Sequence, residues 1–558
     1  MTKSTTSTTS TTRTIARGPA LACVVAAASL VLAGCASGGG GGGSSTSASS
    51  SSSASSSASP STNDTPIDSL TAAIQSPIQA MDILKANDVP TRRALTLAYD
   101  RVLAQDDQGQ LQPMIAESWA NPTPTTFTYT IRSDAKFWDG TPVTAEDVAY
   151  SAQRIIAPDS KAAVAAGWGS VKSIAASGNT VTVVLKQPDN GFAYRAALDW
   201  FVVQKKYSEA AGADLGSPTK PGMGSGPYKV TSYSVADGAT FDLTGTYWGE
   251  EPKVKQVVMQ TIPDPETARL AMVQGDVDVY FDVPLAATRQ FDKASEIAMS
   301  YVTGGYNDML SMRTTTKPFD DVNVRTAMAY LSDTAGLTQP LFNGKATVAK
   351  SIVPAIQISS TINDPAKTDQ FYAGLPAIPS FDIAKAKEAL AKSSVAGGFT
   401  VDLPVDTTQP WMSPYAQNLA QNAKQVGITI NVKNVSPADW GAGLSDPNAS
   451  PLQLLALGAG TPSPSELPPV ILGTIFNPSG YTTPELTKQL DALAAAPTAA
   501  DTIPLLTPVL TTANTELPYI PLYDEQTALA MGKDYVWEGG YSYWAIGQTW
   551  PEYIRSAS

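Results

Sequence analysis

The chain has 558 residues, of which 43% are hydrophobic and 16% are charged, so it is long enough for about three to four domains with real cores. Its formal net charge of −13 makes nucleic acid a poor partner. There is no histidine, which excludes Ser-His-Asp and Cys-His catalysis and imidazole metal ligands. The two cysteines, Cys23 and Cys35, are too few for a zinc cluster or a disulfide framework.

Residues 1–34 are typical of an export signal. Three basic residues precede an apolar run at 20–32, which is shorter than the about 20 residues that span a bilayer but suits a secretory signal. The run ends in the letters LAGC, which resemble the bacterial lipobox, with the cysteine at Cys35. The resemblance implies that Cys35 is lipidated and anchors the protein to a membrane. The alternative is an ordinary signal peptide with a chance cysteine.

Residues 35–65 are expected to form a tether. Six consecutive glycines at 38–43 are followed by Ser, Thr and Ala up to about residue 61, a composition that cannot bury apolar surface. We therefore expect an exported globule on the outer face of the cytoplasmic membrane, or in the periplasm if there is an outer membrane.

Predicted strands and helices alternate along the rest of the chain. We expect strands at 126–132, 181–186, 277–283 and 428–435. We expect helices after the N-caps Thr144, Asp264 and Thr483, and a further helix at 415–426 that Gly427 ends. The alternation indicates an α/β class.

Several segments, in the same order as in a known family, carry a resemblance. They are LQPMIAESW (111–119), TFTYTIRSDAKFWDGTPVTAEDVAYSAQRI (126–155), GSGPY (224–228), VQGDVDV (273–279), KPFDDVNVRTAMAYLSD (317–333) and LPYIPLYDEQ (517–526). Together they resemble the family 5 extracellular solute-binding proteins, the receptors of ABC importers for peptides and, in some members, for nickel, opines or oligosaccharides. The resemblance covers nearly all of the chain after residue 75.

The resemblance implies a two-lobed α/β fold of the periplasmic-binding-protein type, in its large type II peptide-binding class, with an extra subdomain on lobe 1. Solute would lie in the cleft between lobes that close by a hinge. The chain would cross between lobes near Met309 and near Thr507. The expected boundaries are 66–104, 216–308 and 507–558 for lobe 1, 105–215 for the extra subdomain and 309–506 for lobe 2.

The ligand candidates begin with a seven-residue segment at 458–464. Many peptide-binding relatives read roughly GADYPDP here, and the first aspartate pairs with the peptide's α-ammonium group. This chain reads GAGTPSP, so Gly460 and Ser463 replace the aspartates and Thr461 lies between them. A buried ammonium group without a counter-charge is costly. Either Glu466 substitutes, or the solute lacks a free ammonium group; alternatively, Glu466 only opens a helix.

Four further residues are candidates for ligand contact. Arg313 replaces a common asparagine before the predicted 317–333 segment and could bind a carboxylate or phosphate, or form an ordinary ion pair. The aromatic side chains of Tyr99, Trp411 and Trp440 could stack on sugars or pack on peptide side chains. Core or loop packing is the alternative for each.

The leading hypothesis is a receptor without catalysis, cofactor or metal, which passes a solute to an ABC permease. We expect a monomer and a peptide ligand, because that is the family's commonest assignment. An oligosaccharide or other non-peptide solute is the alternative, since both aspartates are missing. The rival class is a secreted glycosidase with a carboxylate pair. A surface sensor or adhesin that lost its permease is a third class.

Overall fold

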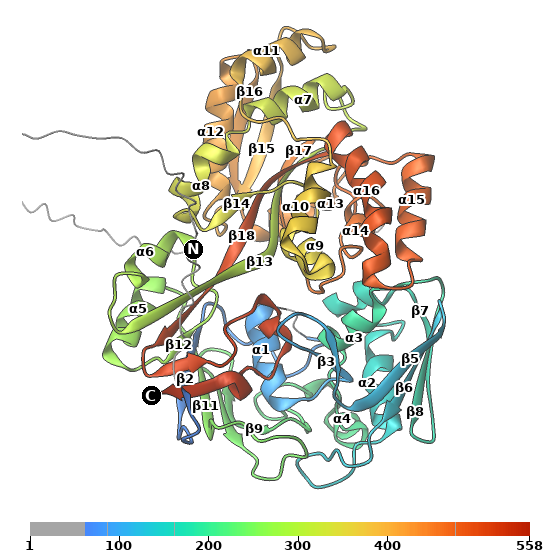
Figure 1. Ribbon diagram of the computed structural model, residues 1–558, viewed down its shortest axis with the longest axis vertical. Helices are drawn as coiled ribbons and strands as arrows, with labels where there is room; N and C mark the ends of the chain where they lie inside the picture. The colour runs from blue at the N-terminus through green and yellow to red at the C-terminus, as the bar shows by residue number, and fades with distance from the viewer. Residues whose placement is uncertain (1–61, 86–87, 161, 475) are drawn as a thin grey trace, which may run out of the picture. The chain divides into compact units, whose positions relative to one another are not determined.

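The computed structural model describes residues 62–558 apart from 86–87, 161 and 475 (Figure 1). The described residues belong to one compact unit. The expected signal peptide, Cys35 and all but the last residues of the expected tether lie outside the described residues. Within them, helices and strands alternate as the sequence indicates, so the predicted α/β class is confirmed.

A nine-stranded mixed sheet forms the centre of the fold, in the order β17-β13-β18-β12-β2-β11-β10-β9, with β14 paired to β18. Its strands are β2 (Leu70–Ile74), β9 (Tyr228–Ser234), β10 (Gly238–Leu243), β11 (Gln256–Thr261), β12 (Val279–Tyr280), β13 (Ile297–Met312), β14 (Ala346–Val348), β17 (Leu452–Gly458) and β18 (Tyr519–Gly532). β2 pairs in parallel with β11 and β12, and the other pairs are antiparallel.

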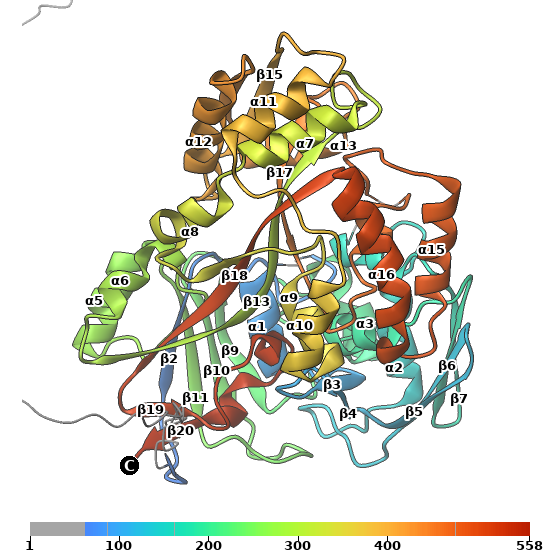
Figure 2. The same cartoon turned by 45° about the horizontal axis from the view of Figure 1, so that its top comes forward.

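Two long strands run side by side through this sheet. β13 has 16 residues and β18 has 14, well above the usual strand length of about five to six. They pair antiparallel from Ile297 opposite Gly532 to Ser311 opposite Tyr519. Figures 1 and 2 show them extending from the part that holds β2 and β11 to the part that holds β17.

We call the elements from β2 to β12 the first lobe and those from α7 (Val322–Leu331) to α16 (Ala499–Glu516) the second lobe. The expected crossing at Met309 falls inside β13. Thr507 falls inside α16, and the crossing strand β18 begins only at Tyr519. The numerical lobe boundaries remain predictions.

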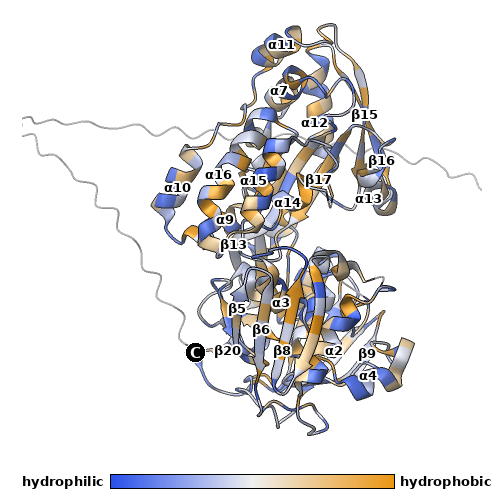
Figure 3. Ribbon diagram, turned by 90° about the vertical axis from the view of Figure 1, so that its right-hand side faces the viewer, coloured by the Kyte–Doolittle hydropathy of each residue, from blue (hydrophilic) through white to orange (hydrophobic). Residues whose placement is uncertain are grey.

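The first lobe carries a second sheet of four strands, in the order β5-β6-β8-β7. These strands are β5 (Ala116–Thr123), β6 (Thr126–Ile131), β7 (Val171–Ser177) and β8 (Thr180–Leu185). β6 and β8 alternate between buried and half-buried side chains, and Figure 3 shows the hydrophobic colouring of β8. Their buried faces pack with α2 (Ala145–Ile155) and α3 (Phe192–Asp199) in a single core that also contains α1 (Val89–Ala98).

The other first-lobe elements are short or surround the large sheet. They are β3 (Leu103–Gln105), β4 (Leu111–Pro113), α4 (Lys205–Ala211), α5 (Pro265–Gln274), α6 (Thr288–Phe291) and, from the chain ends, β1 (Thr62–Asn63), β19 (Tyr535–Trp537) and β20 (Ile554–Ala557). β1, β20 and β19 form a small sheet, so the last residues of the chain return to its first described strand.

The second lobe contains two packed clusters. α7, α11 (Ile383–Ala391) and α12 (Met412–Lys424) pack with the parallel pair β15 (Thr400–Asp406) and β16 (Thr429–Val435). α9 (Ala355–Ile362), α15 (Pro484–Ala494) and α16 pack in a separate cluster with residues of β13 and β17. The remaining helices of this lobe are α8 (Thr334–Phe342), α10 (Pro365–Ala373), α13 (Pro437–Ser445) and α14 (Pro468–Ile471).

Local sequence chemistry explains the element ends that were predicted. Thr144 and Asp147 form the expected capping box of α2, and Asp264 caps α5, which ends at Gly275 in the left-handed conformation. Two predictions were wrong in extent. The strand expected at 277–283 pairs only over Val279–Tyr280, and α12 begins at Met412 rather than at 415.

The GSGPY segment lies against the end of α1. A β-carbon at Gly224 would lie 1.9 Å from the carbonyl oxygen of Ala98, and one at Gly226 would lie 2.6 Å from that of Leu97. No other residue fits so close to a neighbouring backbone. The motif therefore fixes the packing of α1, which supplies part of the site described below.

We predict that Gly224→Ala destabilises the protein, because its methyl group collides with backbone that cannot move aside. The expected loss is at the upper end of the about 1–3 kcal/mol that overpacking costs. Denaturant unfolding measures it. Gly397→Ala is the matched control, since a β-carbon there meets nothing within 4 Å. Equal stability of the two variants would contradict this account.

Candidate functional site

Three neighbouring cavities lie between residues of the two lobes. The first, of about 620 Å³, is lined by the start of α1, the β12–α6 region, β18 and the C-terminal segment around Tyr543. The second, of about 300 Å³, is lined by α1, α3 and the end of β17. The third, of about 500 Å³, is lined by residues 167–195 and 461–494.

Shared lining residues join the cavities into one interlobe groove. Val89, Tyr306, Tyr543 and Ile546 line both the first and the second cavity. Gly167, Arg195, Thr461 and Glu466 line both the second and the third. Ligand sites commonly have about 300–1,000 Å³, and they favour boundaries between structural units. We take this interlobe groove as the candidate ligand site.

Glu466 organises the loop that follows β17. Its carboxylate accepts hydrogen bonds from the backbone N–H groups of Gly460 (3.2 Å) and Thr461 (3.0 Å), from the Thr461 hydroxyl group (2.9 Å) and from Nε2 of Gln357 (2.7 Å). Burial raises the pKa of Glu466, and the bonds from Thr461 together with the charge of Arg195 oppose that rise. Glu466 is thus a carboxylate set into the wall of the interlobe groove.

The geometry also explains why position 460 has no side chain. A β-carbon on Gly460 would lie 2.7 Å from Cδ2 of Leu198 and 3.3 Å from Oε1 of Glu466. An aspartate at 460 would therefore require the side chains of Leu198 and Glu466 to move. The carboxylate of Glu466 lies beside that position instead.

Hydrogen bonds connect the lobes next to this loop. Asn190, at the start of α3, accepts from the Ser465 hydroxyl group (2.7 Å) and donates to the carbonyl oxygen of Leu493 (3.2 Å). The Tyr543 hydroxyl group donates to the carbonyl oxygen of Ala459 (2.7 Å). These bonds hold the walls of the interlobe groove together in this conformation.

The structure brings some predicted residues to the interlobe groove. Gly460, Thr461 and Glu466 line it. Ser463 is buried directly behind it, with its hydroxyl group 2.8 Å from that of Ser465 and its carbonyl oxygen accepting from Gln357 (2.9 Å).

The structure corrects the expected placement of Arg313. Its guanidinium group is buried and donates to the carbonyl oxygens of Asp446 (2.8 Å), Pro447 (2.6 Å) and Ala449 (3.1 Å). It lines a separate cavity of about 310 Å³ in the second lobe. Among the described residues it neither lines the interlobe groove nor forms the ion pair that was the alternative; it stabilises the loop after α13.

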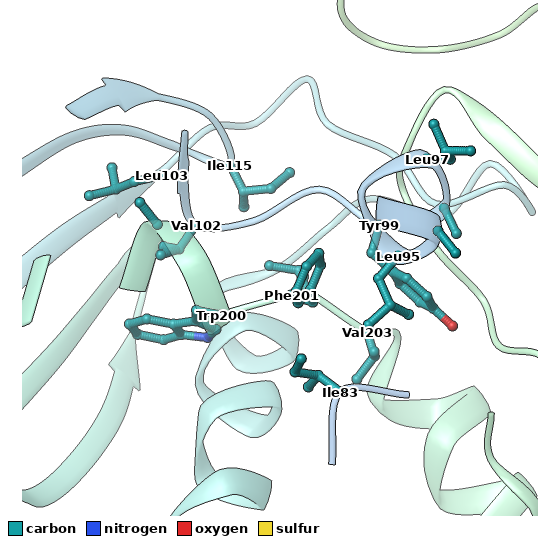
Figure 4. Close-up of a cluster of buried hydrophobic side chains, with 14 of the residues drawn as sticks. Ile83, Leu95, Leu97, Tyr99, Val102, Leu103, Ile115, Trp200, Phe201 and Val203 are labelled. Atoms are coloured by element: carbon teal, nitrogen blue, oxygen red, sulfur yellow. The ribbon is translucent and has the colours of Figure 1, made fainter. Parts of the chain in front are cut away.

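The expected ligand contacts of Tyr99 and Trp411 are likewise corrected. Tyr99 is 1% exposed, and its hydroxyl group donates to the carbonyl oxygens of Met81 and Pro221. Figure 4 shows it in a cluster of buried hydrophobic side chains with Phe201. Trp411 is 4% exposed and packs edge-on against Tyr415 and Tyr523. Both residues pack in the core because apolar neighbours surround their rings.

Trp440 is half-buried and donates from Nε1 to the carbonyl oxygen of Leu454 (3.2 Å). It packs against the two second-lobe clusters and does not line the interlobe groove.

Sequence reasoning missed most charged groups of the interlobe groove. Among the described residues, three ion pairs lie in its walls: Arg92 with Asp199 (2.5 Å), Arg93 with Asp282 (3.0 Å) and Arg195 with Asp189 (2.5 Å). Glu525 also lines it. One signal was available: Asp88 and Pro90 mark the start of α1, and a helix start beside a cleft is a common ligand site.

A comparison with known proteins identifies the family. The profile of the bacterial extracellular solute-binding proteins, family 5 Middle, matches residues 110–474. The chain belongs to this family. The predicted two-lobed fold and the prediction of a binding protein rather than an enzyme are therefore confirmed.

Relatives and solved structures agree with this assignment. The chain is 26% identical over 372 residues to the glutathione-binding protein GsiB of Escherichia coli O6:K15:H31, covering 65% of this chain and 69% of that protein. Its fold is similar to that of DppA from Helicobacter pylori in complex with the peptide STSA, with a TM-score of 0.71, 19% identity and coverage of 89% and 99%. It is also similar to AgaA from A. tumefaciens R10 in complex with agropinic acid, with a TM-score of 0.72, 21% identity and coverage of 88% and 99%.

The described part of the chain offers neither a membrane-spanning helix nor a metal cluster. Among residues 62–558, as far as they are described, no helix has the length and apolar character needed to cross a bilayer. Over the same residues, no three acidic or cysteine side chains gather in a way that would hold a metal ion.

We predict that Trp411→Ala lowers the free energy of unfolding by about 3–5 kcal/mol, because it leaves a cavity among Tyr415 and Tyr523. Trp440→Ala, at a half-buried position, serves as the control and should cost less. Denaturant titration of both variants measures the difference. If Trp411→Ala kept full stability and lost only solute binding, the ligand role would be restored.

Proposed function

We propose that the protein is the receptor of an ABC importer for peptides, which it captures in the interlobe groove by closure of the lobes. One observation carries the proposal: charged groups of both signs line the same linked cavities, with arginines at 92, 93 and 195 and acids at 199, 282, 466 and 525. A peptide carries an ammonium group and a carboxylate at its ends, so such a lining is complementary to it.

The backbone beside the interlobe groove supports the same solute. β17 is an edge strand of the large sheet, and its last residue Gly458 lines the groove with Ala459 and Gly460. Small residues let an extended chain approach the backbone closely, and sheet edges can bind peptides through main-chain hydrogen bonds. The relatives named for glutathione binding and the neighbour solved with a peptide point in the same direction.

We propose that Glu466 supplies the negative charge that the missing aspartates would have given this end of the interlobe groove. Its carboxylate lies beside position 460 and holds the Gly460–Thr461 backbone through hydrogen bonds. Glu466 then both shapes the loop at 460–461 and sets the negative charge at this end of the interlobe groove.

A non-peptide solute, such as an oligosaccharide or an opine-like acid, is the second candidate. Glycine and serine replace the two aspartates at 460 and 463, and a solved neighbour holds agropinic acid. Tyr306, which is 40% exposed and lines the interlobe groove, offers a ring face for such a solute.

Mass spectrometry of the full-length protein purified from its producing cells tests the function. The mass of the ligand that denaturation releases from the wild type is compared with the mass of the ligand released from a Tyr543→Phe variant. This variant loses the hydrogen bond to Ala459. Released short peptides support the proposal. A carbohydrate or opine-like mass in their place would establish the second candidate.

We predict that Asn190→Ala weakens solute binding about tenfold, mainly through faster dissociation. The variant loses both interlobe bonds, to Ser465 and Leu493, and two bonds of about 0.5–1.5 kcal/mol correspond to roughly this factor. Stopped-flow dissociation measures it. Asn448→Ala, at an exposed loop position, should leave the rate unchanged. An unaltered dissociation rate in Asn190→Ala would show that the two interlobe hydrogen bonds of Asn190 play no part in closure of the lobes.

We also propose a monomer that is anchored through lipid on Cys35, works at the outer face of the cytoplasmic membrane and delivers solute to a permease. We predict that Cys35→Ser moves the protein from the membrane fraction to the soluble fraction, because the acyl chains cannot be attached. Cell fractionation with immunoblotting measures this. Continued tight membrane association of Cys35→Ser would contradict lipidation.

A further inference from the structure

Three carboxyl groups lie where the two long strands pair. Asp308 is on β13, and Asp524 and Glu525 are adjacent on β18, with Asn307 opposite Asp524 and Asp308 opposite Tyr523. Asp308 is 0% exposed and Asp524 is 5% exposed. Buried carboxyl groups are costly unless something compensates for them.

Hydrogen-bond donors of the protein compensate for the burial of Asp524. Its Oδ1 accepts from Nδ2 of Asn307 (2.8 Å) and from the backbone N–H group of Ala355 (3.3 Å). Burial still raises the pKa of Asp524 to about 7. This residue joins the strand pair to the start of α9 and needs no further partner.

Asp308 and Glu525 differ from Asp524, because they lack such N–H donors among the described residues. Apart from the carboxyl group of Glu525, which it faces, no group of the described residues forms a hydrogen bond with either carboxyl oxygen of Asp308. Burial and the neighbouring carboxyl groups raise the pKa of Asp308, and burial raises that of Glu525, so the pair favours holding a proton between them.

Glu525 opens this pair to the interlobe groove. The charged residues that line the cavity of about 620 Å³ are Asp88, Arg93, Asp282 and Glu525. Arg93 pairs with Asp282, and Asp88 caps α1 by accepting from the backbone and hydroxyl groups of Thr91. Among the described residues, Glu525 is thus the acid of this cavity that no cation pairs with, and its polar partner is another carboxyl group, that of Asp308.

Glu466 at the other end of the interlobe groove contrasts with Glu525. Four protein donors already occupy the carboxylate of Glu466. Glu466 therefore contributes charge at its own end, but the β18 end offers a solute cation a carboxyl group with more free acceptor capacity.

We propose that Glu525, with the buried Asp308 behind it, binds a cationic group of the solute in this cavity. The inference rests on the proposed function and specifies it, because it requires the solute to carry an ammonium or guanidinium group. No cationic side chain of the described residues pairs with these two carboxyl groups, so an organic cation of the solute would supply their counter-charge. The low polarity of a buried site strengthens that attraction. The group is either the α-ammonium group of a peptide or a basic side chain.

Two pairs of probes distinguish these sources by calorimetry on the full-length protein, freed of bound solute. The first pair is trialanine and N-acetyl-trialanine, and the second is Ala-Lys-Ala and Ala-norleucine-Ala. Wild type should prefer the charged member of at least one pair by about tenfold or more. Glu525→Gln should remove that preference while it leaves binding of the neutral member unchanged.

Glu388→Gln, on the exposed face of α11, is the matched control and should keep the preference. Equal binding within both pairs by wild type would overturn the inference while the peptide function stands. A preference that persists in Glu525→Gln would also overturn it. The comparison within wild type does not depend on whether any variant folds.

Failure of all four peptides to bind would refute the peptide function instead. Arginine and citrulline, which share an α-ammonium group and differ in side-chain charge, then decide the inference by thermal stabilisation of wild type and Glu525→Gln. Stabilisation of wild type by arginine or by both compounds, lost in Glu525→Gln, supports the cation site. Stabilisation that persists in Glu525→Gln, or none by either compound, overturns it.

Discussion

The antiparallel pairing of β13 with β18 is the constraint on which the other features depend. These two strands are far apart in the sequence, yet they share a ladder from Ile297 to Ser311 and run between the two lobes. β17 and β14 are added to this ladder, and so the loop after Gly458 reaches the same region as the residues of α1. The interlobe groove exists because this ladder holds both of its walls.

The ladder also decides which charges can meet a solute. Asp308 and Glu525 come from different strands and become neighbours only through their register. The arginines of α1 are already matched by Asp199 and Asp282. The carboxylate of Glu466 already accepts hydrogen bonds from the backbone N–H groups of Gly460 and Thr461. Among the described residues, the interlobe groove therefore combines ion pairs with Glu525, whose polar partner is another carboxyl group; this is the basis of the proposed selection of a solute by its charge.

Sequence reasoning succeeded where short-range chemistry sets the result. The capping box at Thr144, the Asp264 cap and the alternation of β6 are decided by residues within a few positions of each other. It failed where the environment is assembled from distant segments. For Trp411 the sequence left ligand contact and core packing open, and Tyr415 and Tyr523, from a neighbouring and a distant segment, enclose it. Arg313 binds carbonyl oxygens more than 130 positions away.

The sequence by itself determined the family, the α/β class and the receptor function. Family motifs and caps are local patterns, so a single chain displays them without its fold. Only the tertiary structure decided that Tyr99 and Arg313 serve the scaffold, that Glu466 fills the space beside Gly460, and that Asp308 and Glu525 form a pair. The physical reason is that burial, ion pairing and space for a side chain are properties of the surroundings, and strand pairing over long sequence distances creates those surroundings.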